Sequence, residues 1–175
     1  MEPQTTNTQV TNGTPVQMGP AQMGHLPVLQ VRATKPRFHV GERLDIRIKV
    51  LRQSYVLCFI LDHAGTDAAL LYPAHETDEN RFGPSDKELK YPDDFKSSFP
   101  VGLDRPLSES FHCVATGQPL RDPLKKQWFD NMADVVKKRN GSEDPSISAG
   151  KTKEILSGLR ESEGAFEAST GFAAE

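Results

Sequence analysis

The sequence predicts a mainly β protein: an antiparallel, immunoglobulin-like β-sandwich with a C-terminal amphipathic helix and disordered tails. Residues 44–50 alternate strictly between apolar and charged side chains, and residues 55–61 form a continuous apolar run. The first pattern is typical of a strand with one buried face, and the second of a strand covered on both faces. The predicted organisation is a disordered tail over 1–26, a β-sandwich domain over 27–122, an amphipathic helix over 123–140 and a largely disordered tail over 141–175.

Turn signals divide the predicted sandwich domain into short strands. The Asp62-His63-Ala64-Gly65 turn joins two of them into a hairpin, and Pro73 ends the second. Proline has no N–H to donate to a sheet, so it is typical of a strand end. Strands at this spacing favour an antiparallel sandwich. They are expected at about 28–33, 44–50, 55–61, 68–72 and 109–116.

The polar segment 74–99 predicts a long loop with one short edge strand near 88–91. A loop of this length in a small domain is often functional. Two interpretations of its aromatic side chains stay open, because they either plug the open end of the sandwich or form a recognition patch. Phe82, Tyr91 and Phe95 are the candidate partner-binding residues here.

The predicted helix over 123–140 begins with Asp122 as its N-cap and Pro123 at its first position. Its apolar face either packs on the sandwich, as a single apolar stripe generally does, or docks into a partner or forms a dimer seam. Trp128 and Met132 are the candidate partner-binding residues on it, because tryptophan is enriched at interface hot spots. The face holds Leu124, Trp128, Met132, Val135 and Val136.

Both tails have few apolar side chains, which predicts disorder. A transient helix is expected only over 153–160. Residues 1–24 lack the basic and apolar regions of a signal peptide. Two explanations stay open: a cytosolic protein, or a leader that Met1 has replaced.

Three motifs lie between Phe38 and Leu120. They are Phe38-His39-Val40-Gly41-Glu42 followed by Leu44-Asp45-Ile46; Ser54-Tyr55-Val56-Leu57 through Leu61-Asp62 and Gly65 to Leu70-Leu71-Tyr72-Pro73; and Pro100-Val101-Gly102 followed by the strand from Phe111 to Thr116. Together they resemble the opening, the central hairpin and the closing segment of a bacterial family known only as domain of unknown function 4384. Ala74 departs from the pattern, since the family usually has Asn after the aromatic-Pro pair. The resemblance implies a β-sandwich, often in cell-envelope or secretion-linked proteins, and so favours the periplasm or cell envelope. It implies no catalytic residues.

Charge and hydropathy exclude some partners. The formal net charge is −3, which argues against nucleic acid, since phosphate binding needs a concentrated basic surface. No apolar run reaches the ~20 residues that span a bilayer, so no transmembrane segment is expected.

No catalytic, cofactor-binding or metal-binding residues are predicted. His63, His75, Glu76 and Asp78 match no zinc or EF-hand spacing, although a small-ligand or divalent-ion site in these loops is the alternative function. No Ser-His-Asp arrangement follows from residue order, so an enzyme is not expected. Cys58 and Cys113 are either two buried thiols or a disulfide, depending on the compartment.

The sequence therefore predicts a non-catalytic protein–protein interaction module, an accessory or structural subunit of a bacterial cell-envelope or secretion assembly. Its partner is expected to be another protein.

Overall fold

A computed structural model describes residues 28–63, 68–96, 103, 106–140, 149–162 and 164–175. Only the backbone is described for 133–140 and 149–152. The predicted N-terminal tail over 1–26 lies outside the described residues, as do Gly65 and the Pro100-Val101-Gly102 motif.

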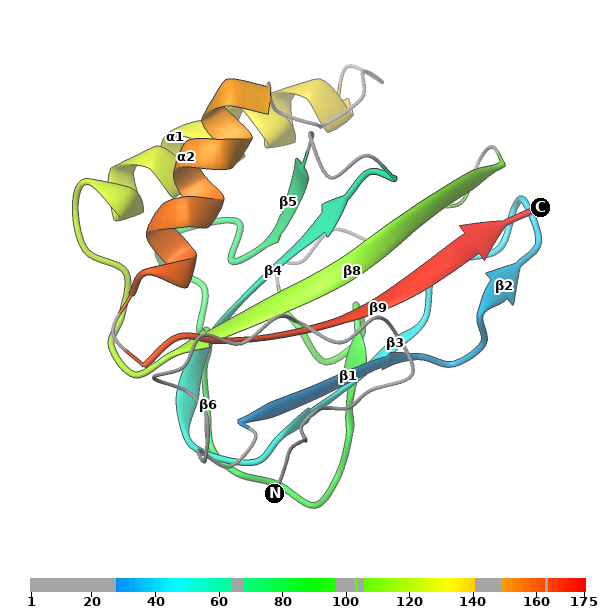
Figure 1. The fold of residues 1–175 in the computed structure, drawn as a ribbon, viewed down its shortest axis with the longest axis horizontal. Helices are drawn as coiled ribbons and strands as arrows, with labels where there is room; N and C mark the ends of the chain where they lie inside the picture. Colours follow the sequence, from blue (N-terminus) through cyan, green and yellow to red (C-terminus); the bar gives the residue numbers. More distant parts are fainter. Residues whose placement is uncertain (1–27, 64–67, 97–102, 104–105, 141–148, 163) are drawn as a thin grey trace, which may run out of the picture.

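Two β-sheets and a pair of helices form three layers (Figure 1). The small sheet has the strand order β1-β3-β7, and the large sheet has the order β2-β9-β8-β4-β5, with β6 pairing with β4. The strands are β1 Leu29–Ala33, β2 Arg37–Phe38, β3 Ile46–Val50, β4 Ser54–Leu61, β5 Ala68–Tyr72, β6 Arg81–Phe82, β7 Leu89–Tyr91, β8 Leu107–Thr116 and β9 Phe166–Ala174. The helices are α1 Leu124–Asn140 and α2 Ala149–Arg160.

This architecture confirms the mainly β class. The predicted strands appear as β1, β3, β4, β5 and β8, and the short edge strand as β7. The predicted hairpin is the antiparallel pair of β4 and β5. The sandwich is not wholly antiparallel, because β2 pairs with β9 in parallel.

Strand β4 lies inside the large sheet and is covered on both faces, which explains its continuous apolar run. Alternate side chains point to opposite faces of a sheet. One set enters the core between the two sheets, and the other enters a second core beneath the helices. The first set is Val56, Cys58 and Ile60; the second is Leu57, Phe59 and Leu61.

The prediction of a largely disordered tail over 141–175 is wrong for 149–162 and 164–175. Residues 149–160 form α2, and β9 lies between β2 and β8 in the large sheet. Hydrogen-bonded neighbours on both sides and the burial of Phe172 stabilise a strand of mostly small residues. Residues 141–148 lie outside the described part of the chain.

Helix α1 begins at Leu124, one residue later than predicted, and ends at Asn140 as predicted. It packs with α2 over one face of the large sheet (Figure 1). A Cβ atom at Gly158 would lie 3.1 Å from the Leu124 side chain. The glycine therefore allows the two helices to approach closely.

Candidate functional site

The loop aromatics predicted to bind a partner lie inside the sandwich. Tyr91 and Phe95 are buried, and Phe82 is partly buried against the same core. Phe95 lies edge-on to Tyr72 with ring centroids 5.2 Å apart, and the Tyr91 ring lies 5.1 Å from that of Phe111. Of the two interpretations, the described residues support a plug that fills the core. A surface patch of Tyr91 and Phe95 is contradicted by their burial.

The predicted helix candidates are buried as well. Trp128 and Met132 are both fully buried between α1 and the large sheet. The Trp128 indole Nε1–H donates a hydrogen bond to the carbonyl oxygen of Pro73, with a separation of 2.9 Å. These side chains complete the domain's own core, so the prediction that they contact a partner is wrong for this structure.

A charged face covers the outer side of the small sheet and is the first candidate site. Its basic side chains come from alternate positions of β1, β3 and β7, which places them opposite the inter-sheet core, and its acidic side chains come from the segments that flank β3 and β7. No strand or helix among the described residues covers this side, since both helices lie on the large sheet (Figure 1). We define the charged face as Arg32, Asp45, Arg47, Lys49, Glu88, Lys90 and Asp94.

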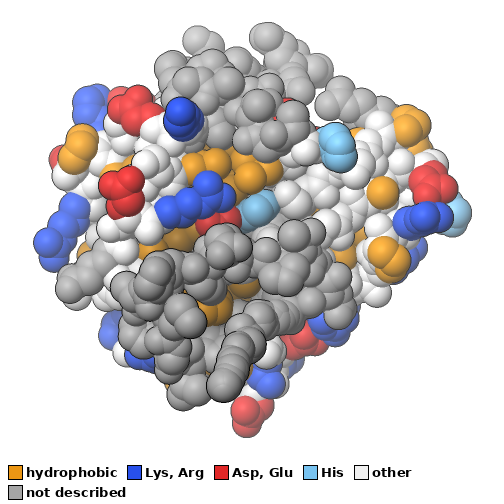
Figure 2. Space-filling view, viewed as in Figure 1, with side chains coloured by type: hydrophobic (Ala, Val, Ile, Leu, Met, Phe, Trp, Pro, Cys, Tyr) orange, Lys and Arg blue, Asp and Glu red, His pale blue; other side chains and the backbone are white. Residues whose placement is uncertain are grey.

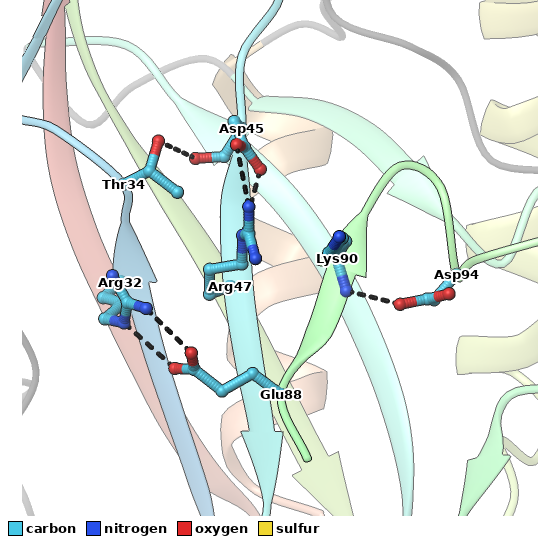
Figure 3. A network of polar contacts seen from close by, with 7 residues as sticks. All are labelled: Arg32, Thr34, Asp45, Arg47, Glu88, Lys90 and Asp94. Atoms are coloured by element: carbon cyan, nitrogen blue, oxygen red, sulfur yellow. Dashed lines mark hydrogen bonds and ion pairs between the residues drawn. The ribbon is translucent and has the colours of Figure 1, made fainter.

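Ion pairs order the charged face (Figure 3). The Arg32 guanidinium donates to both Glu88 carboxylate oxygens, at 2.9 Å and 2.7 Å. The Arg47 guanidinium pairs with the Asp45 carboxylate at 3.2 Å. Asp94 accepts the backbone N–H of Lys90 at 2.8 Å, which occupies a donor on the β7 edge.

The strand register creates an unusual row of cations on this face. Arg32 on β1 lies opposite Arg47 on β3, which in turn lies opposite Lys90 on β7. Like charges directly opposite each other destabilise a sheet by roughly 0.2–1 kcal/mol. The neighbouring carboxylates offset this repulsion. The hydrogen bond from Arg32 is the main cause that holds the pKa of Glu88 below its ordinary value, and Arg47 and Lys49 add to it.

The alternation in β3 indicated the charged face, but the predicted partner-binding residues did not include any residue from it. Arg47 and Lys49 alternate with Ile46, Ile48 and Val50, which indicates one solvated face. The cation row depends on the register between strands far apart in sequence, so residue order alone does not reveal it.

A chain of polar side chains on the helix-covered face of the large sheet is the second candidate site. Ser110 and His112 point to the same side of β8, and Glu167 lies on the adjacent strand β9. The Ser110 hydroxyl lies 2.7 Å from His112 Nε2, and His112 Nδ1 lies 2.7 Å from a Glu167 carboxylate oxygen. Arg160, the last residue of α2, donates to both Glu167 oxygens at 2.6 Å and 3.0 Å. We call these four residues the polar chain.

Glu167 stays ionised although its side chain is only 6% exposed. Burial is the largest influence and by itself would raise the pKa of this carboxyl. Hydrogen bonds from His112 and Arg160, together with the charge of Arg160, outweigh burial and lower the pKa to about 2. The carboxylate is therefore an acceptor for both partners.

Two of the four loop residues considered for an ion site, Glu76 and Asp78, have other side-chain contacts. Asp78 accepts the backbone N–H groups of Ala74 and His75, at 2.8 Å and 2.9 Å. Glu76 pairs with Lys125 of α1 at 3.1 Å. Within the described residues, no group of three or more His, Cys, Asp or Glu is arranged to hold a metal ion.

The two cysteines form a disulfide between adjacent strands. Cys58 on β4 lies directly opposite Cys113 on β8, and both are fully buried in the inter-sheet core. Of the two alternatives that the sequence left open, the structure contains the disulfide.

These features define a β-sandwich domain with one helix-covered sheet and two candidate sites, an exposed charged face and a largely buried polar chain. The model of the family described as domain of unknown function (DUF4384) matches residues 37–119, which confirms the resemblance found in the sequence. The matched segment contains β2 to β8, whereas β1, both helices and β9 lie outside it. No curated protein and no solved structure matches the chain. None of the described helices is long and apolar enough to cross a membrane.

Proposed function

We propose that this chain is a protein–protein interaction module, an accessory or structural subunit of a bacterial cell-envelope or secretion assembly. The proposed role is binding, and the expectation that the chain is not an enzyme stays a prediction. The observation that carries the proposal is the cation row of Arg32, Arg47 and Lys90 on the charged face.

The side chains of the charged face that ion pairs already hold in place favour binding. Side chains already held by ion pairs lose less conformational freedom when a partner docks. The face carries four basic and three acidic side chains, so an acidic surface or segment complements it best. A partner carboxylate near the middle of the row would add to the carboxylates that already offset the repulsion around Arg47.

The disulfide supports the envelope part of the proposal. Disulfides persist in oxidising compartments such as the bacterial periplasm and are rare in the cytosol. Acid quenching of native-host cells, followed by thiol alkylation, reports the redox state directly. We expect Cys58 and Cys113 to be alkylated only after reduction; alkylation without reductant would contradict the proposed location.

A photo-crosslinking residue at Lys49 tests the binding surface. We expect one discrete adduct in the native host, weakened by Arg47→Glu, which reverses the charge in the middle of the row. The matched control places the crosslinker at Lys153, an exposed residue of α2 on the opposite side of the domain.

The charge change has its own control in Lys153→Glu, which should leave the Lys49 adduct unchanged. An adduct formed from Lys153 and not from Lys49 would place the partner on the helices. An adduct that Arg47→Glu leaves at full strength would remove the cation row from the proposal.

A further inference from the structure

We propose that Ser110 is a nucleophile, activated by His112, that accepts an acyl group from an ester substrate. This inference goes beyond the proposed binding function and departs from the expectation that the chain is not an enzyme. That expectation depended on residue order, which shows no Ser-His-Asp arrangement, whereas the fold brings Ser110, His112 and Glu167 into contact.

The polar chain has the connectivity of a serine nucleophile and its base. In such sites the carboxylate contacts His Nδ1 while His Nε2 contacts the serine hydroxyl, and geometry, not sequence position, identifies them. Here the two separations are both 2.7 Å, within the range for hydrogen-bonded groups. The connectivity runs in the required order, from Glu167 through the imidazole to Ser110.

The contacts of His112 set its tautomer and orientation. An ionised carboxylate only accepts, so Nδ1 carries the proton that is donated to Glu167. In the neutral imidazole Nε2 is then an acceptor for the Ser110 O–H. The ring also stacks on Phe59, with centroids 5.2 Å apart and planes at 6°. Packing and hydrogen bonding therefore hold the base in one position.

A purely structural role explains only part of the polar chain. The contacts of Glu167 with Arg160 and His112 join α2, β9 and β8. The contact of the Ser110 hydroxyl with His112 joins no further element, because Ser110 lies two residues before His112 on the same strand. Its hydroxyl contact is the feature that the nucleophile proposal accounts for.

Ser110 is an accessible end of the polar chain, and the Arg160 side chain at the other end is 47% exposed. Ser110 is partly exposed, whereas the His112 and Glu167 side chains are only 12% and 6% exposed. The beginning of β8 extends beyond the two helices (Figure 1), and charged and histidine side chains gather in the middle of this face beside hydrophobic ones (Figure 2).

The chemical step follows from these positions. The Ser110 oxygen attacks the ester carbonyl carbon while its proton passes to His112 Nε2. The tetrahedral adduct collapses, the bond from carbon to the alkoxy oxygen breaks, and the leaving alcohol takes the proton back from His112. The product is an ester on Ser110 with one alcohol released, and Glu167 remains ionised throughout.

A fluorophosphonate probe on the full-length, oxidised chain tests the proposal. Attack by Ser110 on phosphorus would form an O–P bond and release fluoride, which gives a label that peptide mass spectrometry locates. We expect one label, on Ser110, and none in Ser110→Ala. The matched control is Ser108→Ala, since Ser108 lies on the same face of β8 but is exposed and outside the polar chain.

The role of the base has a separate readout. In His112→Gln the labelling rate should fall about a hundredfold, the range of general-base assistance. Wild-type labelling no faster than that of Ser110→Ala would overturn the proposal, as would a label on Ser108. Because these two serine variants alter only one small side chain, they decide the matter even if His112→Gln fails to fold.

Discussion

Arg160 and Glu167 join the end of α2 to the start of β9 through two hydrogen bonds of 2.6 Å and 3.0 Å. The same carboxylate contacts His112 on β8. One buried side chain therefore connects three elements, two of which lie in the segment predicted to be disordered. A carboxylate in this position links the stability of the domain to pH.

Acid should weaken the domain through Glu167. Its pKa is about 2 in the folded protein and near the ordinary carboxyl value in the unfolded chain. The stabilisation is thus fully present above the ordinary value and is lost as pH falls toward 2, up to about 3 kcal/mol in total. Urea unfolding of the wild type and Glu167→Gln at about pH 6 and about pH 3 checks this. If the stability difference between the wild type and Glu167→Gln is as large at about pH 3 as at about pH 6, the prediction is contradicted.

Loss of the disulfide should destabilise the domain strongly. Cys58 and Cys113 are 55 positions apart, so their bond restricts a long loop in the unfolded chain. The loop-entropy relation gives about 4 kcal/mol for this separation. Urea unfolding of Cys58→Ala/Cys113→Ala against the oxidised wild type measures the loss. Reductant should then lower the stability of the wild type and leave the stability of the double variant unchanged.

Replacing Trp128 should affect folding before it affects binding. Trp128→Ala removes a fully buried side chain and is expected to cost about 3–5 kcal/mol. Trp128→Phe keeps most of the volume but leaves the Pro73 carbonyl without its 2.9 Å donor, which costs about 1–3 kcal/mol. Thermal unfolding of both variants checks that Trp128→Ala is the less stable of the two. A fully stable Trp128→Ala would show that the helix does not pack as described.

The C-terminal strand should be essential to the sandwich. Phe172→Ala removes a buried ring from the inter-sheet core and should cost about 3–5 kcal/mol. The neighbouring Ala173→Ser changes the other face of β9, where the residue is only partly buried, and should be nearly neutral. Equal unfolding midpoints for the two variants would contradict the position of β9.

Local patterns predicted the strands whose burial they encode. The alternation in 44–50 and the apolar run in 55–61 correspond to β3 and β4 because each pattern reflects which faces are covered. Strand β9 was not predicted because its residues are mostly small. A signal was present nonetheless: Phe166, Ala168, Thr170, Phe172 and Ala174 recur with the period of a strand and share the inward face.

The candidate sites were harder to predict than the fold. Tyr91, Phe95 and Trp128 were chosen as aromatics in polar or amphipathic segments, yet such residues fill a small core as readily as an interface. The cation row and the polar chain both arise from pairing between strands distant in sequence. His112 and Glu167 are 55 positions apart, so only the fold brings them together.

The position of β9 also constrains the timing of folding. Thr170 on this strand meets the backbone of Ala33, 137 positions earlier, and β9 fills the gap between β2 and β8. Contacts over such separations form slowly. As the chain emerges from a ribosome or a translocation channel, the sheet stays open between β2 and β8 until β9 arrives. During that interval the long edge of β8 is available to other strands. A chaperone that protects this edge would therefore act after β8 has emerged and before β9 has.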